Sequence, residues 1–232
     1  MAYAAVTLAT LRTRLKDRLE ISAFYVDAEL TLALNEALRL WNLYTGTWRR
    51  RVTHLLQPTS DNYFALPQTL VFPMRMEVNG TPMAKSALHD LDHGQPGWEG
   101  QIIGQANIPS SPQVWAPVSP TLIAYWPRVI TTAFTVTVDG VSATPILVSD
   151  SDTVDLNESR HGVLLDYAKH YLTLKRGGTD MEQSAPALQA LLVAAADENE
   201  LFKESSFFRW AMARDEKPEI PPKVVPQQGR GQ

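Results

Sequence analysis

Apolar residues near the start of the chain recur at the spacing of an α-helix. Four leucines between residues 8 and 19 keep this spacing and follow Thr7, whose hydroxyl group can cap the first turn. A second stripe of apolar residues begins after Asp27, which we expect to cap the next helix, and it ends at Gly46. Two amphipathic helices with a short connection predict an antiparallel helical hairpin.

The pattern changes between Arg51 and Val154. Prolines recur through this segment and exclude long helices, while short runs alternate between apolar and polar residues. Asn79-Gly80 and Asp139-Gly140 each lie between such runs, and both dipeptides predict the turn of a β-hairpin. We therefore expect a region of hairpins and long loops. Three tryptophans are expected to anchor these loops by burial: Trp98, Trp115 and Trp126.

Helical spacing returns after Asp155, which with Glu158 forms the pattern of a capping box. Asp166 and His170 lie one turn apart on this helix and are expected to form a pair at its surface. The last run of helical spacing extends from about Ser184 to Arg214 and predicts one helix about 45 Å long. The residues that follow are rich in proline and polar side chains and predict an extended tail.

Together these elements predict an α+β fold. Its core is expected to be a four-helix bundle of two N-terminal and two C-terminal helices, with an inserted Pro-rich β-hairpin region and an extended C-terminal tail. The boundaries follow the changes of pattern. They assign residues 1–50 and 155–214 to the helical domain, 51–154 to the inserted β region, and 215–232 to the tail.

Composition narrows the classes of function. The chain has 232 residues, a net charge of −4 and no cysteine. The acidic balance provides no overall field that would attract nucleic acid. The lack of thiols excludes thiolate nucleophiles and cysteine-based metal sites. We accordingly expect no bound cofactor.

The segment HDLDHGQPGW, residues 89–98, carries the densest group of possible metal ligands. His89 and His93 have the i, i+4 spacing of helical zinc ligands, so one alternative function is a metal-dependent hydrolase that uses His89, Asp92 and His93. The sequence shows no clear further metal ligand and no glutamate that would complete an HExxH motif. The residues GQPGW that follow leave at most one helical turn to hold the histidines. A polar turn before a buried tryptophan accounts for the same residues.

Two clusters predict contacts with other molecules. Arg49, Arg50 and Arg51 follow a tryptophan and could touch phosphate inside a DNA channel, contact a neighbouring subunit, or belong to a DNA-binding module, which is a second alternative function. The run FFRW at residues 207–210 places bulky side chains around the circumference of a helix, so one core cannot bury all of them. A subunit or partner contact is expected there, because aromatic residues and arginine are common interface anchors.

The order of these features resembles the head-to-tail adaptor, or connector, proteins of tailed bacteriophages. The similar segments correspond to two opening helices, a strand with Leu-Pro and a turn, an acidic turn with its tryptophan and loop, and the helix that follows. They are TLATLRTRLKDRLE, YVDAELTLALNEALRLW, YFALPQTLVFPMRMEVNG, LHDLDHGQPGWEG with the later IPSSPQVWAPVSPTLIAYWPRV, and DSDTVDLNESRHGVLLDYAKHYLTLKRG. The similarity is carried by their order along the chain and by no single motif.

The resemblance implies a structural virion protein that is not an enzyme. Such a protein forms a ring, typically of twelve copies, in the neck of the virion between the portal and a tail nozzle or hub protein. It continues the channel, through which DNA passes without specific binding. The resemblance also implies synthesis in the host cytoplasm and no contact with a membrane. The portal is expected to bind the C-terminal end of the chain, with six candidate residues: Phe207, Phe208, Trp210, Ile220, Val224 and Val225.

Overall fold

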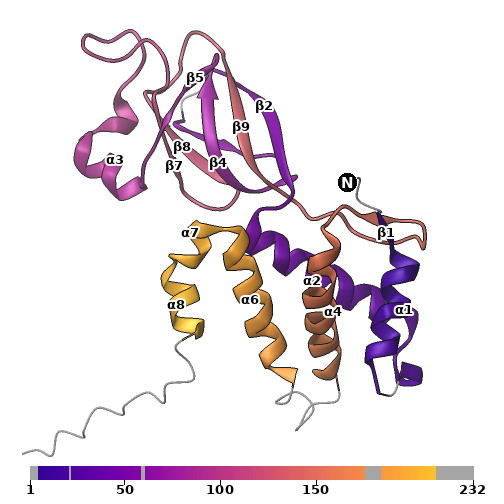
Figure 1. The fold of residues 1–232 in the computed structure, drawn as a ribbon. Helices are drawn as coiled ribbons and strands as arrows, with labels where there is room; N and C mark the ends of the chain where they lie inside the picture. The colour runs from indigo at the N-terminus through magenta and orange to yellow at the C-terminus, as the bar shows by residue number, and fades with distance from the viewer. Residues whose placement is uncertain (1–4, 21, 59–60, 176–183, 213–232) are drawn as a thin grey trace, which may run out of the picture.

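The computed structural model describes residues 5–20, 22–58, 61–175 and 184–212. In these residues most helices gather in one part of the molecule and most strands in another, and the short helix at residues 88–94 lies beside the strands (Figure 1). The helices, of which η1 and η2 are short 3-10 helices, are α1 (Leu8–Arg18), η1 (Ser22–Phe24), α2 (Asp27–Thr45), α3 (Leu88–Gly94), η2 (Trp98–Gly100), α4 (Glu158–Thr173), α6 (Pro186–Glu198), α7 (Glu200–Lys203) and α8 (Ser206–Met212). The strands are β1 (Val6–Thr7), β2 (Arg49–Leu56), β3 (Tyr63–Ala65), β4 (Leu70–Val78), β5 (Thr81–Pro82), β6 (Ala84–Lys85), β7 (Val114–Pro117), β8 (Leu122–Trp126), β9 (Phe134–Ser142) and β10 (Thr153–Val154).

Local interactions decide where the first two long helices begin and end. The Thr7 hydroxyl accepts a hydrogen bond from the backbone N–H three residues later, at 3.3 Å, so the predicted cap of α1 is confirmed. In α2 the capping position is Val26 and the predicted Asp27 is already helical, while the Glu29 carboxylate accepts from the Val26 N–H at 3.1 Å. Gly46 ends α2 as predicted, in the left-handed region at φ 61°.

The helix α4 begins at a different cap from the predicted one. Asn157 precedes the helix, and its side-chain oxygen accepts a hydrogen bond from the Ser159 N–H at 3.0 Å. The predicted capping residue, Asp155, lies two residues before Asn157. The capping-box prediction is wrong here because a second good capping residue stands closer to the first turn.

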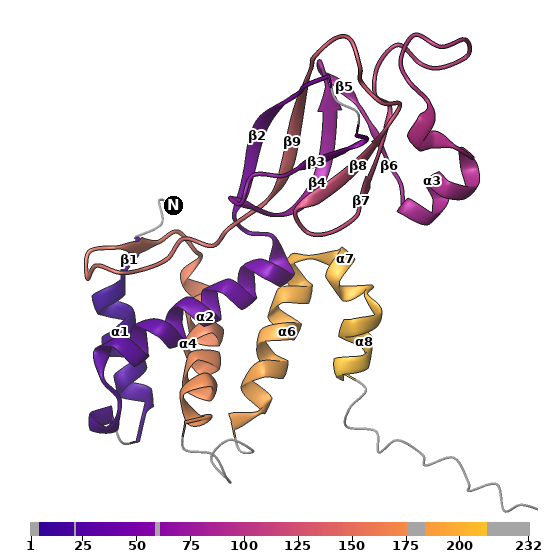
Figure 2. The same cartoon turned by 180° about the vertical axis from the view of Figure 1, so that it is seen from behind.

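The predicted four-helix bundle core is wrong. The helix α2 packs against α1, α4 and α6, but it lies across them, whereas the helices of a bundle run nearly parallel (Figures 1 and 2). With 19 residues, α2 is long enough to cover all three partners. The strands also enclose two further clusters of buried apolar residues, so the helices do not hold the only core. The fold is α+β with three sheets in the described residues.

The single long C-terminal helix that the sequence predicts is also wrong. The helix α6 ends at Glu198, and Asn199 adopts an extended conformation at φ −139° and ψ 95° before α7 begins. The side-chain amide of Asn199 donates a hydrogen bond to the backbone carbonyl of Tyr44, at the end of α2, at 2.6 Å. This contact turns the chain, so that Phe202 of α7 is buried against the helical core and α8 follows as a separate short helix.

The strands form two sheets of four and one small pair. The order is β2-β9-β4-β5 in the first sheet and β3-β8-β7-β6 in the second, and β1 pairs with β10 at the start of α1. Residues of both four-stranded sheets meet in one buried cluster, among them Met76 and Val138 of the first and Trp115 and Ile123 of the second. The two sheets therefore pack face to face around an apolar core of their own.

The two predicted hairpin turns have different outcomes. Asn79 and Gly80, at φ 48° and 82°, connect β4 to β5, so this turn is confirmed. Asp139 and Gly140 lie inside β9, paired with β2 on one side and β4 on the other, so the turn predicted there is wrong. Glycine is needed in this strand because β4 comes very close: a Cβ atom on Gly140 would lie 2.5 Å from the carbonyl oxygen of Phe72.

The three tryptophans of the β part are buried, as predicted. Trp98, Trp115 and Trp126 are 3%, 1% and 8% exposed. The indole N–H of Trp98 donates to the Asp92 carboxylate at 2.8 Å, and that of Trp126 donates to the Gln101 side-chain oxygen at 2.7 Å. The first bond joins α3 to η2, whose Trp98 packs against β7 and β8, and the second joins the loop after η2 to β8.

Candidate interaction surfaces

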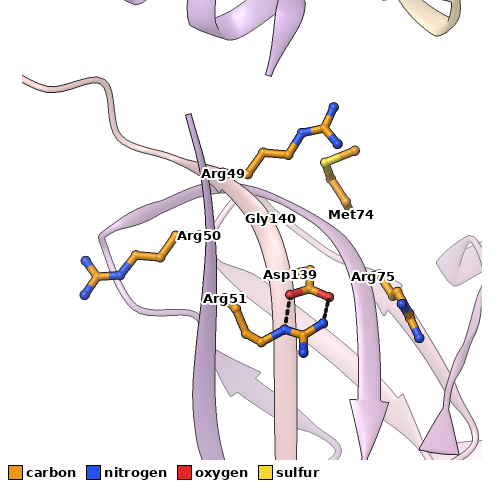
Figure 3. A pocket seen from close by; sticks show the side chains of 7 residues that line it. All are labelled: Arg49, Arg50, Arg51, Met74, Arg75, Asp139 and Gly140. Carbon is orange, nitrogen blue, oxygen red and sulfur yellow. Dashed lines mark hydrogen bonds and ion pairs between the residues drawn. The ribbon is translucent and has the colours of Figure 1, made fainter. Parts of the chain in front are cut away.

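The run of arginines lies on β2, the edge strand of the first sheet. Successive side chains of a strand point to opposite faces, so Arg49 and Arg51 lie on one face and Arg50 on the other (Figure 3). Arg51 makes two hydrogen bonds to Asp139 of β9, from Nε at 2.6 Å and from Nη2 at 2.8 Å. This contact raises the pKa of Arg51 and lowers the pKa of Asp139, because each charge is stabilised by the other.

The arginines surround an open cavity of about 390 Å³, which we call the arginine face. It is lined by Arg49, Arg50, Arg51, Met74, Arg75, Asp139 and Gly140. Arg49 donates through Nε to the Gly46 carbonyl at 3.0 Å, and Arg75 forms an ion pair with Glu77. The guanidinium groups of Arg49, Arg51 and Arg75 share this face with two carboxylates, while that of Arg50 points away from it, and the surface carries net positive charge. The arginine face can attract an anionic group such as a phosphate through its charge. Contacts of this kind do not distinguish one base sequence from another.

The histidines of α3 do not gather a metal site in the described part of the chain. The rings of His89 and His93 lie 4.1 Å apart, but no group of three or more possible ligands comes together there. Asp92, the third residue of the hydrolase alternative, accepts the hydrogen bond from the buried Trp98. The cluster is thus a short polar helix before a buried tryptophan, and it gives the hydrolase alternative no geometric support.

The aromatic residues of α8 divide between core and surface. Phe208 is half-buried and packs against the helical core. Phe207 and Trp210 are 44% and 59% exposed, although Phe207 also stacks on Tyr44 with the ring centroids 5.8 Å apart. Three further candidates for portal binding, Ile220, Val224 and Val225, lie outside the described residues.

The surface pair predicted on α4 is wrong. Asp166 forms its ion pair with Arg18 of α1. His170 points inward, and its Nδ1 lies 2.7 Å from the Ser184 hydroxyl. His161, on the same helix, is also buried, and its Nε2 lies 3.1 Å from the Leu156 carbonyl oxygen. Burial lowers the pKa of both histidines, because the charged imidazolium would lose its hydration.

An apolar groove beside α2 is a surface that the sequence analysis missed. This α2 groove has a volume of about 540 Å³; one wall is α2, and the other is formed by β4, β9 and the segment 143–146 that follows β9. Leu32, Leu43 and Ile146, which line it, are 52%, 60% and 76% exposed. Leu32 and Leu43 lie outside the buried stripe of α2, so the sequence already indicates that part of the apolar surface of this helix is left out of the core. The opposite wall comes from residues far along the chain, so only the fold reveals a groove.

One protein family matches nearly all of the described chain. The family model described as SU10 adaptor protein matches residues 6–211, from β1 into α8. This chain belongs to the SU10 adaptor protein family. A search of the curated proteins finds no match.

As an SU10 adaptor, the chain is a phage structural adaptor, which confirms the resemblance to head-to-tail adaptors. Membership implies contact with other components of the virion, and the family is generally non-enzymatic. Among the described helices, none combines the length and the apolar character needed to cross a bilayer. Three surfaces of the described chain are candidates for contacts with other virion components: the arginine face, α8 and the α2 groove.

Proposed function

We propose that this SU10 adaptor forms a ring of about twelve copies in the neck of the virion, held by contacts that repeat around a rotation axis. The ring lies between the portal and a tail nozzle or hub protein and continues the channel for DNA. The chain is made in the host cytoplasm and needs no membrane to assemble. The observation that carries the proposal is the family match over residues 6–211.

The charge of the chain supports passage of DNA without specific binding. A net charge of −4 on every copy gives a ring that repels phosphate overall. Arg49, Arg50 and Arg51 are a local exception, and we propose that they contact either the DNA in the channel or a carboxylate of the neighbouring copy. Duplex binding that weakens steeply with salt, and that is lost in Arg50→Ala, would favour DNA as their partner.

We further propose that the C-terminal end of the chain, from Phe207 to Gln232, docks on the portal. The segment EIPPKVVP combines apolar side chains with prolines. Prolines restrict the unbound chain, so less entropy is lost when such a segment lies along a groove or a sheet edge. A structural adaptor needs a surface that reaches its neighbour above the ring, and residues 215–232 come after the last described residue that packs against the helical core, Met212 of α8.

Deletion of residues 215–232 tests the docking. The shortened protein should remain folded, with an unchanged circular dichroism spectrum, and should no longer bind isolated portal rings in sedimentation. A full-length variant with Ile220, Val224 and Val225 all changed to serine is a second test that should also lose portal binding, because it keeps the length and charge of the tail while removing its apolar contacts. Wild-type binding by both proteins would show that the portal is bound elsewhere, and the first two helices would be examined next.

A further inference from the structure

Two apolar surfaces of the described chain remain largely exposed. The α2 groove exposes more than half of each of Leu32, Leu43 and Ile146. The helix α8 exposes Phe207 and Trp210 by 44% and 59%. Monomeric proteins rarely leave apolar groups of this size gathered at the surface unless another molecule covers them. One surface is concave and the other is a short helix with protruding rings.

We propose that α8 of one copy docks in the α2 groove of a second copy, with Phe207 and Trp210 as its anchors. The inference rests on the proposed ring and identifies the contact between its subunits. Because the groove and α8 are different surfaces, each copy carries one of each, and the same contact repeats from copy to copy until the ring closes. The inference narrows the proposed portal contact: Phe207 and Trp210 bind the neighbouring copy, and Ile220, Val224 and Val225 of the tail bind the portal.

The shapes of the two surfaces match. Phe207 and Trp210 lie at i and i+3, on one face of α8, with ring centroids 6.1 Å apart. A helix that places apolar anchors at this spacing into a groove is a recurring mode of recognition. Phe207 and Trp210 are 44% and 59% exposed, so both rings still have apolar surface to bury, and the α2 groove of about 540 Å³ is a concave surface lined largely by apolar side chains.

Charged groups at the edges of the two surfaces can also pair. Glu36 lines the α2 groove, and its Oε2 binds the exposed Arg39 at 2.9 Å and 2.6 Å. Arg39 lines the groove too, but both of its bonds to Glu36 use Oε2, which leaves Oε1 for a second donor. Arg209 extends from the side of α8, next to the face that carries the two anchors, and its Nη2 donates to the Glu204 backbone carbonyl at 2.6 Å. When α8 enters the groove, the guanidinium group of Arg209 approaches the carboxylate of Glu36, which favours one orientation of the helix.

Complementation between two disabled variants tests the contact without the portal. Leu43→Arg places a charge in the groove, and Trp210→Ser removes an anchor; each alone should weaken self-association by at least about tenfold in sedimentation. An equimolar mixture should form one-to-one heterodimers and nothing larger, because only one intact groove and one intact α8 remain per pair. Leu55→Arg is the matched control, since Leu55 is a similarly exposed leucine, 48% exposed, on β2.

Disulfide trapping gives a second measurement, because the natural chain contains no cysteine. We would oxidise a mixture of two single variants, Arg39→Cys and Arg209→Cys, one of them carrying a size tag. The mixed disulfide should form several-fold faster than in a mixture of Arg209→Cys with Thr53→Cys, which lies on the exposed side of β2. Because the two cysteines are on different chains, the mixed disulfide cannot form within one subunit.

The outcomes separate this contact from the proposed function. Heterodimers in the mixture and a preferred disulfide support the contact. The contact is overturned if the mixture stays as dissociated as its components or if Leu55→Arg weakens self-association equally. It is also overturned if the disulfide forms no faster than in the control mixture, or if the wild-type protein never self-associates. Portal binding by the wild-type protein is measured independently, so the adaptor function could stand while this contact fails.

Discussion

Gly140→Ala tests whether the close approach of β4 to β9 decides the residue at this position. The new Cβ atom would lie 2.5 Å from the Phe72 carbonyl oxygen and 3.2 Å from the Pro73 Cα atom. Both neighbours are backbone atoms, so relief requires movement of a strand. Overpacking of this kind costs about 1–3 kcal/mol. For a chain of 232 residues, this corresponds to a drop in the thermal midpoint of about 2–12 °C.

Gly162→Ala is the matched control. Gly162 lies within α4, and the nearest atom to its added Cβ would be Arg18 Nη2 at 4.0 Å. Alanine there should stabilise the protein by about 0.5–1 kcal/mol, because glycine is a poor helix former. Thermal and urea unfolding followed by circular dichroism would measure both variants. An unchanged or higher midpoint for Gly140→Ala, at an unchanged m-value, would refute the reasoning, since a tolerated alanine stabilises through the unfolded chain.

Three further predictions concern the helical part and the arginine face. Burial lowers the pKa of His161 and His170 from the ordinary value of 6.5. The unfolded chain therefore binds more protons than the folded chain as the pH falls below 6.5, so the folding stability that these neutral histidines contribute above that pH is lost. A double change of these histidines to glutamine should reduce the fall in thermal midpoint between about pH 7.5 and 5.5. Asn199→Ala should cost about 1–3 kcal/mol in urea unfolding, because the Tyr44 carbonyl loses its partner. Arg51→Ala should leave the thermal midpoint unchanged, since its ion pair is exposed; a clear drop would contradict this.

The sequence determined the features that depend on neighbouring residues. The cap at Thr7, the stop at Gly46 and the turn at Asn79-Gly80 are each decided within about four residues, because a capping hydrogen bond or a positive φ angle is a local property. The apolar stripes of the helices followed for the same reason, and the burial of the tryptophans was expected from the large apolar surface of each ring. The sequence also indicated the family, because the order of patterned segments along the chain can be recognised before their packing is known.

Tertiary contacts decided the rest. Asp139-Gly140 favours a turn by itself, yet it becomes part of a strand because β2 and β4 bind it on both sides. The C-terminal helix breaks at Asn199 because the Tyr44 carbonyl, distant in sequence, offers its side chain a hydrogen bond. The α2 groove likewise exists only because the segment 143–146 returns beside α2. A sequence pattern shows which face of an element is apolar, but which partner covers that face, and which faces stay exposed, depends on how the whole chain packs.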